Sequence, residues 1–507
     1  MKLIITIAWR NIQRHRGKSL VIGIILFLGA FIMTVGNGVL SGMDKGLREN
    51  IMNRFTGHVV LVAKNQQSDN VLFIPMGRDL LVMNHYKDIK KVLDAQDYIA
   101  SFIPVARGFT LILNEDGDLG FSLTLGVNFQ DYQKFFKNNV LLVEGRLMKN
   151  DERGVLVTTG SRRQMYDRQD FWAVPEGMKL NPDTLTPEAK QNIARLNIRH
   201  DVVLMGSSSE NTTVDVRVPV RGIVKYEYLN DYWENFNILD IESFREAFHY
   251  VTAEDAAVEI PQERKQILQA ENLEDSLFAG ATVVNPADTG AKVYRVENLI
   301  GRKVVKKNVD IDAGAYNVVF IKLKDSREID RDVARINAAL EGSGADARAV
   351  TWKKATGQLA DMATIIRTAL FVFVVFIFFV AIIIIMNTLS MAAMERVSEL
   401  GMMRAVGAQK RFIASMFFSE TAFLSFLFGG AGILAGVLCV YVLGLLDITT
   451  TNRILELLFG GSVFRPVLDF WDIFTGVIEL AAVTVLATIY PIRTARRITP
   501  LEAVARD

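Results

Sequence analysis

Residues 369–389 read ALFVFVVFIFFVAIIIIMNTL and contain no charged side chain. A helix needs about 20 predominantly apolar residues to cross about 30 Å of hydrocarbon. This run therefore predicts a membrane-spanning helix, which we assign to 367–391. Other apolar runs predict three more spans, of which the last contains Glu479, at 20–42, 414–446 and 473–491.

Lysine and arginine residues gather in the short segments that flank these spans. The basic segments are 1–19, 392–413 and 492–507. Because positive short loops stay on the cytoplasmic side, we expect both termini and 392–413 to be cytoplasmic. The first span could also be read as a signal peptide, but its apolar run is too long and lacks an A-x-A cleavage site.

The long stretch between the first two spans is predicted to be an extracytoplasmic α+β domain, at 57–350. Runs such as FTLIL from Phe109 and FSLTLGV from Phe121 have strand composition, and helical stretches are interspersed with them. We expect insertions near 164–199 and 252–307. Apolar residues at helical spacing predict stalk helices at 43–56 and 351–366.

The last extracytoplasmic segment is expected at 447–472, between the third and fourth spans. The sequence thus predicts an α-helical membrane protein with four transmembrane helices and an α+β extracytoplasmic domain on helical stalks. Lys+Arg at 57 nearly balance Asp+Glu at 56, so no overall field favours nucleic acid. The only cysteine, Cys439, excludes an internal disulfide.

Enzyme chemistry has little support in this sequence. Gly17-Lys18-Ser19 lacks the first glycine of a phosphate-binding loop, and the five histidines show no metal-ligand spacing. We therefore expect no catalytic residue, cofactor or metal in this chain. A membrane-anchored enzyme stays an alternative, but it would need a catalytic constellation that is not visible here.

Four residues inside the spans are candidates for special roles. Glu420 and Glu479 carry a desolvation cost that often marks function in membranes, although both lie close enough to helix ends to snorkel or pair. Gly432 and Gly436 form G-x-x-x-G, which allows close helix approach, and dimerisation through it is a hypothesis.

The segment MERVSELGMMRAVGAQKRFI at 394–413 resembles the cytoplasmic loop of MacB-type and lipoprotein-releasing (Lol-type) ABC permeases. Two further stretches are similar to the same family: GVLSGMDKGLRENIMNRFTGHV at 38–59 and YPIRTARRITPLEAVARD at 490–507. The resemblance implies a MacB-type permease architecture. It also implies a segment that couples to a separate ATPase, formed by Glu395, Glu399, Gly401, Arg404, Ala405, Gly407 and Ala408.

The same resemblance implies partners and a location. They are a cytoplasmic ABC ATPase dimer that binds ATP and Mg, a second permease copy or paralogue, and the bacterial inner membrane. Lipoprotein release toward a periplasmic carrier is the leading function. The alternatives are MacB-like efflux with an adaptor and an outer-membrane channel, and an FtsX-like scaffold that controls cell-wall hydrolases.

Overall fold

The chain forms two compact units. A computed structural model describes residues 10, 13–14, 16–73, 80–83, 85–114, 118–207, 213–253, 310–395, 397–450 and 452–497. One unit, here the membrane unit, comprises Met1–Thr56, Glu227–Asp231 and Thr356–Asp507. The other, here the α+β unit, comprises Gly57–Tyr226 and Tyr232–Ala355.

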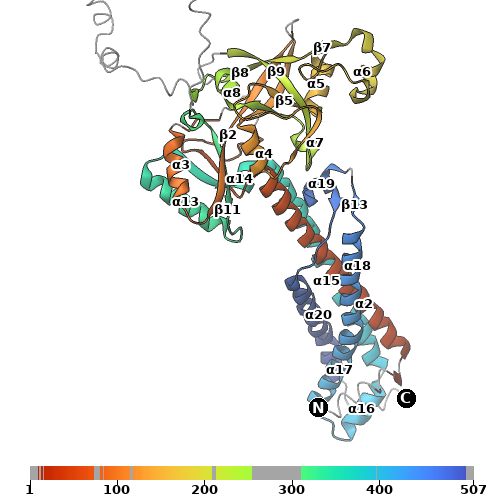
Figure 1. Ribbon diagram of the computed structural model, residues 1–507. Coiled ribbons are helices and arrows are strands. Elements are labelled where there is room, and N and C mark those ends of the chain that lie inside the picture. Colours follow the sequence, from red (N-terminus) through yellow and green to blue (C-terminus); the bar gives the residue numbers. More distant parts are fainter. Residues whose placement is uncertain are drawn as a thin grey trace, which may run out of the picture. The chain divides into compact units, whose positions relative to one another are not determined.

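The membrane unit contains four helices that are long and apolar enough to cross a membrane, counted over the described residues. They run through Ser19–Thr56, Ala360–Met391, Lys410–Leu445 and Phe470–Arg493. The predicted class, a four-span helical membrane protein with an α+β domain, is therefore confirmed. The corresponding elements in Figure 1 are α2 (Arg16–Gly46), α15 (Gln358–Glu395), α17 (Lys410–Leu424), α18 (Gly430–Leu445) and α20 (Phe470–Arg497).

Apolar side chains hold these helices together and also cover their outer surfaces. One buried cluster joins Leu26 of α2 to Ile385 of α15 and Val483 of α20. Other large apolar side chains, such as Phe371 and Phe376 of α15, are exposed. An outward apolar surface of this kind suits hydrocarbon rather than water, as expected for spans.

Among the described residues of the membrane unit, two segments are π-helical. The segment η5 (Ser425–Gly429) joins α17 to α18, and η1 (Leu47–Thr56) continues α2 over most of the predicted stalk 43–56. The buried residues of η1 are Leu47, Ile51, Met52, Phe55 and Thr56. A π-helix has i→i+5 hydrogen bonds and therefore a wider turn than an α-helix. This wider turn places Ile51 and Met52, and then Phe55 and Thr56, on the same buried face.

The α+β unit is built on a ten-stranded sheet in which six strands close into a ring. The ring follows the pairing order β2–β3–β10–β5–β9–β8 and back to β2. Its strands are β2 (Ile99–Leu113), β3 (Leu119–Val127), β5 (Val155–Thr158), β8 (Asp201–Ser207), β9 (Thr213–Tyr226) and β10 (Phe236–Asp240). The remaining strands are β1 (Val59–Ala63), β4 (Val140–Gly145), β11 (Val318–Leu323) and β12 (Ala347–Thr351).

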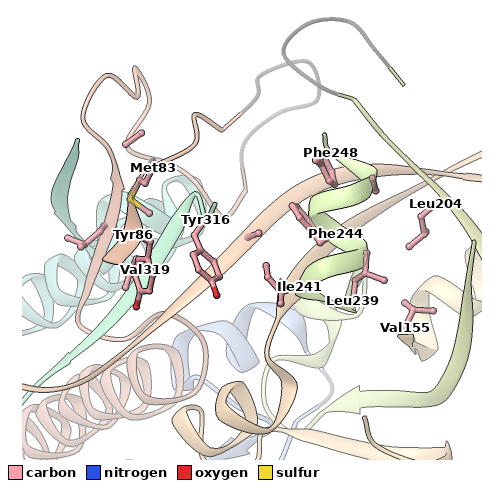
Figure 2. Packing of buried hydrophobic residues seen from close by; sticks show 14 of the residues in the cluster. Met83, Tyr86, Val155, Leu204, Leu239, Ile241, Phe244, Phe248, Tyr316 and Val319 are labelled. Atoms are coloured by element: carbon pink, nitrogen blue, oxygen red, sulfur yellow. The ribbon is translucent and has the colours of Figure 1, made fainter. Parts of the chain in front are cut away.

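The helix α8 (Ile241–Ala247) packs against five strands of this ring, β2, β3, β8, β9 and β10. A Cβ atom at Gly108 of β2 would overlap the Phe248 ring, and one at Gly126 of β3 would overlap Phe244. Because glycine has no side chain, Gly108 and Gly126 leave space for the aromatic rings of Phe248 and Phe244. Figure 2 shows Phe244 and Phe248 beside Ile241, within the main hydrophobic core of the unit.

Helices cover the other strands and link them. The principal ones are α3 (Tyr86–Asp94), α4 (Phe129–Phe135), α5 (Thr159–Gln169), α7 (Asn230–Trp233), α13 (Ile329–Ser343) and α14 (Trp352–Thr356). The predicted insertion at 164–199 begins within α5 and contains α6 (Pro187–Gln191), β6 (Phe171–Ala173) and β7 (Asn197–Arg199). Of the insertion at 252–307, only residues 252 and 253 are described, and the carboxyl-terminal segment 492–507 is described to residue 497.

Candidate functional site

The segment predicted to couple to an ATPase forms a short helix, α16 (Val397–Ala405), between α15 and α17. In Figure 1 it lies at the end of the membrane helices opposite α19 (Arg453–Phe459). Val397 packs in a small core with Ile413, Met416 and Phe417 of α17. Burial of these apolar side chains fixes α16 against the start of α17.

A glycine turn ends this helix and fixes the direction of the chain after it. Gly407 has φ of 101°, in the left-handed region that favours glycine. The Gly407 N–H donates to the Arg404 carbonyl at 3.0 Å, and the Ala408 N–H donates to the Met403 carbonyl at 2.9 Å. The end of α16 is therefore capped by its own backbone.

The structure brings six of the seven predicted coupling residues together on α16 and its turn. Glu399 pairs with Arg14 at 3.1 Å, but both side chains are largely exposed, so the pair contributes little stability. The seventh, Glu395, ends α15. The other members are Gly401, Arg404, Ala405, Gly407 and Ala408.

Two large apolar residues that the sequence prediction missed are exposed in this segment. The Val406 side chain follows α16 and is 90% exposed, and Met402 within α16 is 59% exposed. Apolar side chains held outward on a fixed element are typical of a surface that docks a partner. We call Met402, Val406 and the six predicted residues on α16 and its turn the α16 surface.

The candidate residues inside the spans lie elsewhere. Glu420 is buried on α17. Glu479 on α20 accepts a hydrogen bond from the Asn37 side-chain amide of α2 at 3.3 Å. It therefore has a polar partner on another span, which lowers the cost of a carboxyl group in an apolar region.

The Asn37 contact is one of three polar contacts along a single face of α2. The Ser41 hydroxyl donates to the Asp472 carboxylate at 2.8 Å, and Asp44 pairs with Arg367 of α15 at 2.7 Å. Residues three and four positions apart share a helix face, so Asn37, Ser41 and Asp44 form one row. The sequence prediction missed this row, because its partners are distant along the chain.

Gly432 and Gly436 of α18 face α2 of the same chain. A Cβ atom at Gly432 would overlap the Phe27 carbonyl oxygen, and one at Gly436 would lie 2.7 Å from the Thr34 Cβ. The two glycines therefore allow α18 to approach the backbone of α2 closely.

The described residues contain no group of three or more His, Cys, Asp or Glu side chains placed to hold a metal ion. His58 is buried in the α+β unit, where its Nδ1 accepts the Leu323 N–H at 2.8 Å. Burial, together with the charge of Lys322, lowers the His58 pKa to about 4. This histidine is therefore neutral at physiological pH and has a structural contact.

Comparisons with known proteins find matches that include the carboxyl-terminal membrane helices. Residues 371–500 match the FtsX-like permease C-terminal family. An uncharacterized ABC transporter permease of Methanocaldococcus jannaschii is 25% identical over 252 residues, which are 46% of this chain and 60% of that relative. The match thus spans less than two thirds of the relative's own length.

The carboxyl-terminal part of the chain is thus similar to FtsX-like permeases, and the chain is similar to an ABC transporter permease. These matches do not single out the Lol-type branch. The crystal structure of the periplasmic region of MacB from Actinobacillus actinomycetemcomitans is similar over 61% of this chain and 94% of that structure, at 12% identity and a TM-score of 0.27. That score is too low to establish a common fold.

Proposed function

We propose that this chain is the permease subunit of an ATP-driven complex and that a separate ABC ATPase docks on the α16 surface. The observation that carries the proposal is the helix α16, anchored by Val397 while Met402 and Val406 stay exposed. The family match supports it, because 371–500 includes the whole segment. ATP and Mg are bound by the partner, as an ATPase dimer.

The cargo and location follow from the resemblance. The stretch 38–59 resembles the Lol-type pattern, which favours release of lipoproteins from the bacterial inner membrane to a periplasmic carrier. The proposal includes a second permease copy or paralogue and cytoplasmic termini. Efflux with an adaptor and channel, or control of cell-wall hydrolases, are the alternatives that the experiment separates.

The test is affinity purification of the tagged full-length chain from its host in mild detergent, with mass spectrometry and an ATPase assay. We expect an ABC ATPase to co-purify with lipoproteins. Co-purification of an adaptor and an outer-membrane channel would indicate efflux instead of lipoprotein release. Co-purification of a cell-wall hydrolase would indicate a signalling function instead. Absence of any ATPase would overturn the permease function.

The docking site is tested in the same preparation with Val406→Asp. A charge placed in a desolvated contact should weaken binding at least tenfold, which corresponds to about 1.4 kcal/mol. The matched control is Val251→Asp, since Val251 is also exposed but lies in the α+β unit. If Val406→Asp and Val251→Asp co-purify equal amounts of the ATPase subunit, docking at the α16 surface is contradicted.

A further inference from the structure

A short segment of chain belongs to the membrane unit although the residues on both sides of it belong to the α+β unit. This segment is Glu227–Asp231, between β9 and α7. At its start, the buried Tyr226 hydroxyl donates to the Phe236 carbonyl at 3.1 Å. At its end, the buried Trp233 ring lies 4.8 Å from the Phe236 ring, measured between centroids. Both ends are therefore fixed in a packed core.

Arg54 of η1 binds two consecutive residues of this segment. Its Nη1 lies 2.9 Å from the Glu227 carboxylate, and its guanidinium carbon lies 3.9 Å from the centre of the Tyr228 ring. The Arg54 side chain is mostly buried, at 20% exposure, so solvent screens these contacts less than it would on an open surface. One side chain thus combines an ion pair with a cation–π contact.

The next residue, Leu229, is held in an unusual backbone conformation. Its φ is 50°, in the left-handed region that a leucine rarely adopts, and its side chain is fully buried. Such a conformation persists only where the surroundings impose it. Its presence beside the Arg54 contacts indicates that 227–229 is held by packing rather than by its own preference.

The turn after α19 also contacts η1. The Asn50 side-chain amide donates to the Phe459 carbonyl at 3.4 Å. A Cβ atom at Gly461 would lie 3.1 Å from the Tyr228 ring, so the turn also contacts the segment. The segment Glu227–Leu229, η1 and the turn at 459–461 therefore pack together within the membrane unit.

We propose that Arg54 is a positioning residue that clamps Glu227–Leu229 to η1, so that displacement of α2 and η1 is passed to the α+β unit. This inference rests on the proposed function, in which ATP hydrolysis drives the movement. The chain passes between the two units after Thr56, Tyr226, Asp231 and Ala355. The clamp therefore adds a second attachment to the one that the stalks supply, and it enters the α+β unit at β9 and α7.

The experiment measures movement and hydrolysis separately in the full-length complex with its ATPase. Fluorophores are attached at Lys324→Cys in the α+β unit and Thr449→Cys in the membrane unit, in a Cys439→Ser background; both labelled positions are exposed. We expect Arg54→Met to reduce the ATP-dependent change in energy transfer at least fivefold while hydrolysis stays within twofold of the parent protein. Arg54→Lys, which keeps the charge, should retain most of the change.

The matched control is Arg48→Met, which removes an exposed arginine from the same helix. Glu227→Gln is the second variant, and it should reduce the energy-transfer change without altering η1 itself. A full energy-transfer change in folded Arg54→Met or in Glu227→Gln would overturn the clamp. Loss of the change in Arg48→Met to the same degree would overturn it as well.

A parent complex that shows neither hydrolysis nor a nucleotide response would overturn the proposed function instead. The clamp is then tested on the full-length chain alone, by hydrogen exchange of peptides that cover 226–232. Faster exchange in Arg54→Met than in Arg48→Met supports the clamp, and equal exchange overturns it.

Discussion

At the residue scale, His58 is the clearest case of a buried group that constrains the α+β unit. Its backbone N–H donates to the Ile321 carbonyl at 2.8 Å, and its ring accepts the Leu323 N–H. The ring therefore joins β1 to β11 in its neutral form. A protonated ring could not accept that hydrogen bond, which agrees with the lowered pKa of about 4.

This pKa predicts a loss of stability in acid. Between pH 4 and 6.5 the unfolded chain binds a proton at His58 that the folded chain does not. The contribution of the neutral His58 ring to the free energy of unfolding is therefore complete above pH 6.5 and is lost as the pH falls toward 4. We expect a loss of roughly 2 kcal/mol, allowing for solvent screening. Urea unfolding of the full chain in detergent, compared with His58→Gln, measures it. Identical pH slopes for both proteins would contradict the assignment.

At the scale of elements, the packing of α18 on α2 depends on glycine at particular positions. Gly432→Ala would push against the Phe27 carbonyl, whereas a Cβ atom at Gly430 meets nothing within 4 Å. We expect Gly432→Ala to destabilise the protein by about 1–3 kcal/mol. Gly430→Ala should be neutral or slightly stabilising, because alanine favours helix.

Thermal unfolding in one detergent, followed by intrinsic fluorescence, distinguishes the two glycine variants. A lower midpoint for Gly432→Ala alone is the expected result. Equal midpoints would mean that α18 does not pack on α2 as closely as described.

The membrane helices could be predicted from sequence because a long apolar run is a strong local signal. The row of Asn37, Ser41 and Asp44 could not, because each polar residue appears isolated until α20 and α15 supply its partner. The exposure of the Val406 side chain could not be predicted from the sequence either. An apolar residue in a sequence is usually expected to be buried. Only the packing of Val397 in the structure shows which side of α16 faces inward.

At the scale of the whole molecule, the strands of the α+β unit were visible as short apolar runs, but the ring was not. Its closure needs β10 to pair in parallel with β3 and β5 to pair in parallel with β9. These partners are far apart in sequence, and nothing local specifies them. The segment Glu227–Asp231 was likewise unremarkable as sequence, because its role depends on contacts with η1.

These contacts predict how the α+β unit behaves when residues 57–355 are produced alone. The core around Phe244 and Phe248 lies within this range, so the fragment should fold. Glu227 and Tyr228 would lose their contacts with Arg54, and we expect peptides covering 227–231 to exchange amide hydrogen at least tenfold faster than in the full chain. Mass spectrometry measures this, with peptides from β2 as an internal reference. Equal protection in both forms would contradict the predicted loss of packing.

The four passages of the chain between the units also limit how such proteins can diverge. A domain inserted at one point of a helical scaffold can be exchanged by recombination, because only its two ends must match. Here a transplanted 57–355 would bring its own Glu227 and Tyr228 to the recipient's Arg54. These three residues would have to be inherited together, so chimaeras that exchange the α+β unit should require matching substitutions in η1.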